Sequence, residues 1–148
     1  MPDPTDLKIL SLLSSDARLS ARAISSKLGL STATVIKRTT NLEKQGFIKG
    51  YSALIDYDAL GYQMQVIIQV RVAHGKEEFI EKKLMKENAI TAVYDVTGDF
   101  DLLIIARFKS RQSLNNYVKR LQTFEFVERT QTLLILNTFK EKPLEDLT

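Results

Sequence analysis

The sequence predicts an α+β chain with an N-terminal winged helix-turn-helix followed by a ferredoxin-like βαββαβ domain. Apolar residues recur at helical spacing in the first part of the chain, and from Gly61 onward they alternate with polar residues as in a half-buried strand. The 148 residues, 44% of them hydrophobic, suffice for a packed core without disulfides or a structural metal. We place the first domain at residues 1–50, a linker strand or hinge at residues 51–61 and the second domain at residues 62–148.

The composition argues against several classes of protein. The chain has no cysteine and one histidine, His74, so disulfides, cysteine nucleophiles and the common transition-metal sites lack their ligands. No apolar run is long enough to span a membrane, and the start, MPDPTDLK, lacks the basic and then apolar pattern of a signal peptide. We therefore expect a cytoplasmic protein with no metal, no cofactor and no membrane partner.

Basic residues are concentrated near the N-terminus. Between Ala17 and Lys49 there are seven cations against one anion, whereas the rest of the chain has a net charge of −3. Such a segment suits a polyanion such as double-stranded DNA, although a solvated surface gives the same charge run. The local fold decides between these two interpretations.

Caps mark the first two helices. Asp3 or Thr5 is placed to cap a first helix, whose apolar stripe consists of Leu7, Ile9, Leu10, Leu12 and Leu13. Ser20 caps a short second helix that stops at Gly29, a residue that adopts the left-handed conformation without strain. The turn from Gly29 to Ser31 is three residues long with glycine first, as in a helix-turn-helix.

The third helix carries the candidate DNA contacts. Ser31 caps a helix of residues 32 to about 45 that turns Val35 and Leu42 inward. Its outward face offers hydroxyl, amide and cationic groups, which can bond phosphates and base edges together. Residues 47–56 are then expected to form a strand or hairpin, the wing of a winged helix. With one cation of the second helix, the candidate DNA-binding residues are Arg22, Ser31, Thr32, Thr34, Lys37, Arg38 and Asn41.

The second domain alternates strands and helices in the order βαββαβ. Strands are expected at residues 64–72, 90–97, 100–109 and 126–139, with a turn at Gly98 and Asp99. The inward residues of the first helix are expected to be Phe79, Ile80 and Leu84. Those of the second are expected to be Leu114, Tyr117, Val118 and Leu121.

The sheet of this domain has apolar residues on both faces. In the third strand Leu102 and Ile104 alternate with Leu103 and Ile105. Helices in this topology cover one face only, so the second face needs another cover. A second copy of the same sheet is the simplest cover, and we expect a homodimer. The alternative is that twist or the short segment 57–62 covers the face within one chain.

An enzyme is not expected. His74 lies at a strand end beside a glycine, without a motif serine or paired carboxylates, as a surface histidine does. The phosphate-binding patterns GxxxxGK[ST] and GxGxxG are absent. Asp99 and Asp101 fall short of the roughly six oxygen ligands that calcium needs.

Several segments, taken in order, resemble the Lrp/AsnC, or feast/famine, transcription regulators of bacteria and archaea. Residues 6–10, 16–18 and 29–51 are similar to the family's first helix, turn and recognition helix, and residues 96–101 and 130–132 to its effector-binding domain. The resemblance implies a winged helix-turn-helix joined by a strand to a βαββαβ domain that dimerises through its sheets. It also implies that dimers assemble into tetramers or octamers.

Two places depart from the family pattern. Position 39 is Thr where the family usually has Ile or Val, which weakens the core side of the recognition helix. Glu125-Phe126-Val127 replaces the usual Pro-Gly-Val before the last strand, which bears on subunit packing around the ligand crevice. Neither change removes a DNA contact.

The resemblance further implies that an amino acid binds near the Gly98 turn. The backbone at Gly98 can approach a carboxylate closely, and Asp99 or Asp101 can accept from an ammonium. Thr130 and Thr132 are two apart on one face of the last strand and offer hydroxyls. These five residues are the candidate ligand-binding set. A plain hairpin turn with two exposed threonines would give the same spacing.

Together these features predict a sequence-specific DNA-binding transcription regulator whose oligomeric assembly is altered by a small amino-acid effector. Two alternatives stay open. One is a constitutive, ligand-free DNA-organising protein, and the other is a small-molecule-binding oligomer whose helix-turn-helix is vestigial.

Overall fold

The chain folds into two compact units in the computed structural model, which describes residues 1–144 and 146–148. The helical unit contains Met1–Leu54 and Phe139–Thr148, and the sheet unit contains Ile55–Thr138. The predicted hinge, residues 51–61, is therefore divided between the two units. The last ten residues, which the sequence analysis placed in the second domain, are grouped with the first unit instead.

Three short helices build the helical unit: α1 (Pro4–Ser15), α2 (Ala21–Leu28) and α3 (Thr32–Lys44). Each has a side-chain N-cap, because Asp3, Ser20 and Ser31 accept from the backbone N–H three residues further on. Gly29 ends α2 with φ of 66°, the left-handed conformation that glycine adopts at no steric cost. The predicted caps and helix-turn-helix are thus confirmed.

A small core holds the helical unit together, and it consists of Ile9, Ile24, Val35 and Leu42, each at most 2% exposed. All three helices contribute, so this cluster fixes α3 against α1 and α2. The C-terminal segment adds to the unit through α1. The backbone N–H of Leu147 donates to Ser11 Oγ over 3.0 Å, and Ser14 Oγ donates to the carbonyl of Leu144.

The wing strand predicted at residues 47–56 is not formed. The N–H groups of Phe47 and Ile48 both donate to the carbonyl of Leu42, at 3.0 and 3.3 Å, and so close the end of α3. Residues 49–56 are exposed and pair with no strand in the described part of the chain. A strand needs a partner for its backbone groups, and the local apolar pattern does not supply one.

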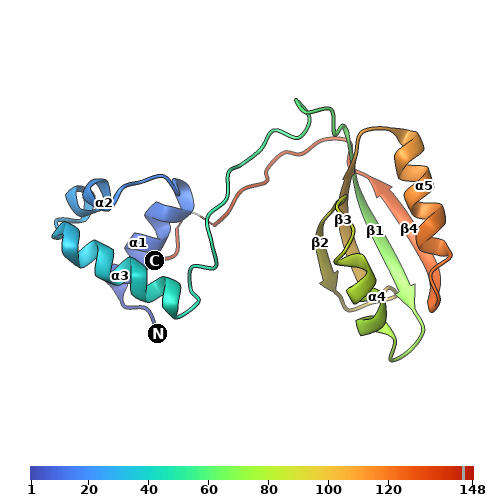
Figure 1. The fold of residues 1–148 in the computed structure, drawn as a ribbon, viewed down its shortest axis with the longest axis horizontal. Helices are drawn as coiled ribbons and strands as arrows, with labels where there is room; N and C mark the ends of the chain where they lie inside the picture. The colour runs from blue at the N-terminus through green and yellow to red at the C-terminus, as the bar shows by residue number, and fades with distance from the viewer. Residues whose placement is uncertain (145) are drawn as a thin grey trace. The chain divides into compact units, whose positions relative to one another are not determined.

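The sheet unit is a four-stranded antiparallel sheet in the order β2-β3-β1-β4. Figure 1 shows its two helices against this sheet. In chain order the elements are β1 (Met64–Val72), α4 (Glu77–Leu84), β2 (Ile90–Asp95), β3 (Leu102–Phe108), α5 (Arg111–Gln122) and β4 (Val127–Leu134). This is the predicted βαββαβ order. No helix in residues 1–144 and 146–148 is long and apolar enough to cross a membrane.

The core of the sheet unit lies between the helices and one face of the sheet. Alternate residues of β1 and β3 are buried there together with Ile80, Leu84, Leu114, Tyr117 and Leu121. Phe79 was expected to point inward but is 42% exposed. Its ring packs edge-on against Phe126 instead, with ring centroids 5.3 Å apart.

β4 is shorter than the predicted strand of residues 126–139 and ends at Leu134. Val66 pairs with Leu134, and the carbonyl of Gln65 accepts from the N–H of Ile135 over 2.9 Å. Because β1 begins at Met64, later residues of the chain have no further partner on that strand. The predicted strand was too long because the apolar pattern of the sequence continues beyond the residues that pair with β1.

The second face of the sheet carries no helix and is partly apolar. Ile67 of β1 pairs with Ile105 of β3 on one side and with Leu133 of β4 on the other. Leu103 pairs with Tyr94 of β2, which is 53% exposed. These five residues are called the open apolar face below. None of them belongs to the fully buried core.

Candidate functional site

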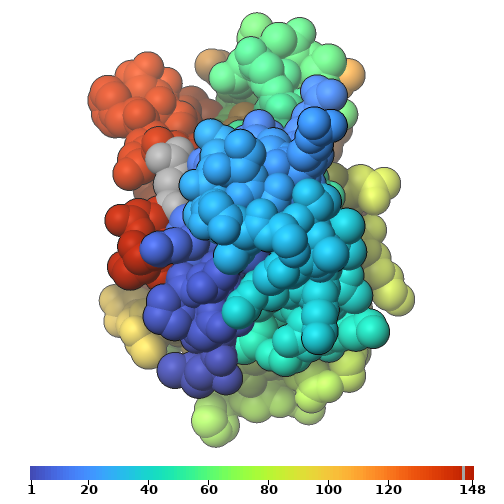
Figure 2. Space-filling view, turned by 90° about the vertical axis from the view of Figure 1, so that its left-hand side faces the viewer, coloured from blue at the N-terminus to red at the C-terminus, as the bar shows by residue number. Residues whose placement is uncertain are grey.

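A hollow of about 680 Å³ runs along the outer side of α3. Figure 2 looks onto the helical unit, where α3 is coloured cyan. The residues that line the hollow are Thr34, Lys37, Arg38, Thr40, Asn41 and Lys44. We call this surface the α3 groove. It combines two lysines, an arginine, an amide and hydroxyls, which are the groups that bond phosphates and base edges.

The structure brings part of the predicted DNA-binding set together in this groove. Thr34, Lys37, Arg38 and Asn41 line it, whereas Arg22 lies on α2 and is exposed. Thr40 and Lys44 were missed by the sequence analysis. Helical spacing could have found them, because they follow Lys37 by three and seven residues and so share its face.

Ser31 and Thr32 are engaged within the helix-turn-helix. Ser31 Oγ accepts from the N–H of Thr34 at 3.0 Å and lies 2.7 Å from Thr34 Oγ1. Thr32 Oγ1 lies 3.3 Å from Ser25 Oγ on α2. These hydroxyls therefore shape the turn and the start of α3.

Arg38 is held by two carboxylates from the start of α1. Its Nη1 donates to Asp3 Oδ2 at 2.7 Å and to Asp6 Oδ1 at 2.8 Å. The ion pairs raise the pKa of Arg38 and, chiefly through the hydrogen bond from Arg38, lower the pKa of Asp3. Arg38 thus enters the α3 groove with part of its charge already compensated.

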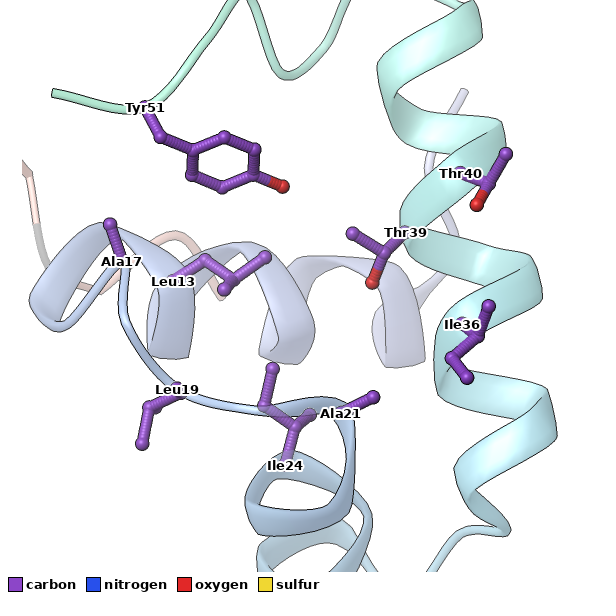
Figure 3. A pocket seen from close by; sticks show the side chains of 9 residues that line it. All are labelled: Leu13, Ala17, Leu19, Ala21, Ile24, Ile36, Thr39, Thr40 and Tyr51. Carbon is purple, nitrogen blue, oxygen red and sulfur yellow. The ribbon is translucent and has the colours of Figure 1, made fainter.

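Behind α3 lies an apolar hollow of about 260 Å³, shown in Figure 3. α1, α2 and α3 all contribute to it, through side chains such as Leu13, Ile24 and Thr39. Tyr51 covers one side, and its hydroxyl donates to Glu43 Oε1 at 2.8 Å. Burial and the nearby Glu43 carboxylate raise the pKa of Tyr51. This contact ties the segment after α3 to the helix itself.

The predicted ligand residues Gly98, Asp99 and Asp101 form one turn between β2 and β3. Gly98 has φ of 117°, a conformation that L side chains rarely adopt. Asp101 Oδ2 accepts from the N–H of Val72 at 2.7 Å, so this carboxylate also holds the end of β1. Asp99 is exposed, and its backbone carbonyl accepts from Arg71 Nη1 at 3.1 Å.

Thr130 and Thr132 lie on the other side of β1 from this turn. They pair with Val70 and Ile68, whose side chains belong to the core beneath the helices. Gln122 Nε2 of α5 donates to Thr130 Oγ1 at 3.0 Å. Within one chain, therefore, the two threonines and the Gly98 turn flank β1 and do not share a turn or a strand.

Two arginines near the turn were missed by the sequence analysis. Arg71 and Arg129 pair across β1 and β4, and the guanidinium of Arg129 lies 4.5 Å from the ring centre of Phe100. Only the strand register places them side by side, so the sequence pattern gave no signal. No group of three or more histidine, aspartate and glutamate residues in the described chain could hold a metal ion.

Two family models match separate parts of the chain. A winged helix-turn-helix DNA-binding model matches residues 2–49, and a Lrp/AsnC ligand binding domain model matches residues 65–145. A helix-turn-helix followed by this ligand-binding domain defines a transcription regulator with a ligand-binding part. The chain belongs to the Lrp/AsnC family.

Curated relatives and solved structures agree with this assignment. An uncharacterized HTH-type transcriptional regulator of Pyrococcus furiosus is 40% identical over 139 residues, covering 94% of each chain. The HTH-type transcriptional regulator FL11 of Pyrococcus horikoshii is 37% identical over 94% of this chain and 92% of its own. A transcriptional regulator of Neisseria meningitidis, solved as a complex with L-Met, superposes with a TM-score of 0.90 at 26% identity, covering 96% of this chain and 94% of that one.

Proposed function

We propose that this regulator binds double-stranded DNA sequence-specifically through the α3 groove and that an amino acid bound near the Gly98 turn controls its assembly. The observation that carries the DNA proposal is the convergence of Lys37, Asn41 and Lys44 on one exposed side of a capped helix. A helix of 13 residues is about 20 Å long, which suits the major groove of B-DNA. Of the predicted contacts, Ser31, Thr32 and Arg22 would act at the edge of this surface.

The DNA proposal is tested by selection from a random DNA pool, followed by titrations of the enriched site over a range of salt concentrations. The wild-type protein is expected to enrich a pseudo-palindromic site. Lys37→Ala and Lys44→Ala are each expected to flatten the slope of log K against log salt by about 0.9, because each loses one phosphate contact. Lys86→Ala, an exposed lysine beyond α4, is the matched control. Failure of the wild type to enrich any site would contradict the proposal.

The effector proposal rests on the turn geometry and on the family. The open backbone at Gly98 offers N–H groups to a carboxylate, and Arg71 and Arg129 add positive charge beside it. Asp99 and Asp101 are the proposed acceptors for the ammonium. The L-Met complex of the Neisseria meningitidis regulator supports an amino acid as the class of ligand. Thr130 and Thr132, on the other side of β1 from the turn, remain proposed ligand residues.

Calorimetry with the twenty amino acids tests the effector proposal. At least one is expected to bind, and Asp99→Asn is expected to weaken it about tenfold or more, because one charge-assisted hydrogen bond is lost. Asp99 is the better first variant because Asp101 also holds the N–H of Val72. Glu125→Gln, an exposed acid of the same unit, is the control. Binding of no amino acid at millimolar concentration would leave the ligand-free DNA-organising alternative.

We further propose that two chains pair through the open apolar face and that these dimers assemble into tetramers or octamers. The face carries Ile67, Leu103, Ile105, Tyr94 and Leu133 without a helix above them. We infer no catalytic role, and a regulator acting on DNA would work in the cytoplasm. A transition from one assembly to another on effector binding would link the two halves of the proposal.

A further inference from the structure

Arg38 is unusual among the cations of the α3 groove because it is already paired. Its side chain is 32% exposed, and its two partners differ, with Asp3 at 47% and Asp6 at 16% exposed. Asp3 is the N-cap of α1 and Asp6 lies in its first turn, both more than thirty residues earlier in the chain than Arg38. Among the residues that line the α3 groove, Arg38 alone forms a salt bridge within the described part of the chain. The arrangement therefore requires an explanation specific to Arg38.

The two acids are themselves fixed by a capping box. Asp3 Oδ1 accepts from the N–H of Asp6 at 2.8 Å, and Asp6 Oδ2 accepts from the N–H of Asp3 at 3.1 Å. Each carboxylate thus uses one oxygen for the cap and the other for Arg38. Pro4 at the first helical position restricts the backbone between them. Arg38 is consequently anchored to a rigid element.

The anchoring leaves one edge of the guanidinium open. Nη1 donates both hydrogen bonds to the acids, and Nε and Nη2 donate none within the described residues. The Nε and Nη2 donors form the parallel fork that bonds guanine O6 and N7, or two oxygens of a phosphate. Arg38 is one of the residues that line the α3 groove, together with Lys37 and Asn41, and we therefore assign this fork to the proposed DNA-binding surface.

The local charge favours a base over a phosphate. Two carboxylates accompany one guanidinium at this point, so the cluster carries a net negative charge that repels the DNA backbone. This negative charge weakens a contact to a charged phosphate but has little effect on a hydrogen bond to the neutral acceptors of guanine. Lys37 and Lys44 form no salt bridge within the described residues and therefore suit the phosphates better.

We propose that Asp3 and Asp6 are specificity-determining positioning residues, which hold Arg38 so that its free fork reads one base pair in each half-site. The proposal rests on DNA binding through α3. It assigns to the start of α1 a part in sequence recognition, although no residue of α1 lines the groove.

The test repeats the random-pool selection with the full-length Asp3→Asn, Asp6→Asn double variant. Asparagine caps helices about as well as aspartate, so α1 is expected to remain folded. Removal of two negative charges is expected to raise affinity for random DNA, while preference at one base pair per half-site falls roughly tenfold. Asp16→Asn, at the other end of α1, is the control for the loss of an acid. It is expected to leave base preferences unchanged.

A second variant covers the case in which the double variant fails to fold. Arg38→Lys keeps a cation for the two acids but lacks the fork, so it is expected to relax the same base pair. If either folded variant enriches the wild-type motif with unchanged preference at every position, the inference is overturned. If Asp3 and Asp6 only stabilise the fold, the double variant will bind all DNA sequences more weakly by one common factor. That result would also overturn the inference. If the wild type enriches no motif, DNA recognition itself fails, which is a separate result.

Discussion

Thr39 places a hydroxyl on the inner side of α3, where the helical unit has its apolar hollow (Figure 3). Thr39→Val replaces that hydroxyl by a methyl group of similar size. We expect a gain of about 0.5–1 kcal/mol in the free energy of unfolding, since cavity-facing polar atoms cost desolvation. Thermal denaturation checks this, with Thr97→Val, a change at an exposed threonine of the sheet unit, as control. A lower midpoint for Thr39→Val would mean that the hydroxyl has a favourable partner.

Asp3 gives the helical unit a defined acid sensitivity. Its pKa is lowered in the folded chain, first by the hydrogen bond from Arg38 and then by the N–H of Asp6. A lowered pKa means that the ionised form is stabilised by folding. This contribution is therefore complete above the ordinary aspartate pKa of about 3.9 and is lost as pH falls through the lower folded value.

We accordingly expect the thermal unfolding midpoint of the wild type to fall more steeply than that of Asp3→Asn as the pH is lowered from about 5 to about 2. This range brackets the ordinary aspartate pKa of about 3.9. The groups facing Asp3 are Arg38, which stays charged throughout, and Asp6. Glu125→Gln, in the other unit, is expected to follow the wild-type curve. Parallel curves for the wild type and Asp3→Asn would contradict the assignment.

Sequence reasoning succeeded for residues whose partners are near in the chain. The caps Ser20 and Ser31 and the terminator Gly29 act on backbone groups a few residues away, so local pattern suffices. The pairing of Arg38 with Asp3 and Asp6 could not be predicted in this way. It depends on the angle at which α3 crosses α1, which only the packed core determines.

Among the elements, the entry to β4 combines strain with packing. Phe126 has φ of 73°, the one positive φ of a non-glycine residue in the described chain. The resemblance to the family's Pro-Gly-Val pattern implies a glycine at this position. Here a bulky side chain keeps the left-handed backbone, and its ring contacts Phe79 and Lys76 Nζ. The cost of the conformation is offset by these contacts.

The strain predicts an inverted order of two truncations. Phe126→Gly and Phe126→Ala lose the same ring contacts, but glycine relieves the backbone and alanine does not. We expect the glycine variant to be the more stable by about 1 kcal/mol, the reverse of the usual ranking. Chemical denaturation measures the difference. At Phe124, whose φ is not positive, the same pair of changes should show the usual ranking, with alanine more stable.

The elements also show where pattern alone fails. β1 was predicted correctly because its apolar and polar residues alternate, as expected of a strand with one buried face. This alternation can be recognised from the side chains of the strand itself. The predictions of a wing strand at residues 47–56 and of a last strand reaching residue 139 were wrong. Both depend on whether a partner strand is present, which the local pattern does not show. The prediction that Phe79 points inward was wrong because this residue lies at the boundary of the buried stripe of its helix. Phe126 covers its ring only partly.

At the scale of the whole molecule, a single charged substitution in the open apolar face tests whether two chains pair through it. Ile105→Asp puts a carboxylate between Ile67 and Ala92, its partners across the sheet. A buried, unpaired carboxylate costs several kcal/mol, so we expect dimers and larger species to dissociate in sedimentation experiments. Gln131→Asp, paired with Gln69 on the same face, places the same charge among polar neighbours as a control. Circular dichroism confirms folding. An unchanged assembly of folded Ile105→Asp would contradict the proposed pairing.

The contacts of Leu144 and Leu147 with α1 have a practical consequence for anyone who handles this protein. Ser11 and Ser14 bond the tail, so the C-terminus belongs to the unit that carries the α3 groove. An affinity tag or a fluorescent fusion attached after Thr148 would thus be joined to the DNA-reading unit. A fragment ending at Leu54 would lack a piece of the same unit. Labels meant to report on the Gly98 turn are better introduced at exposed sites within residues 55–138.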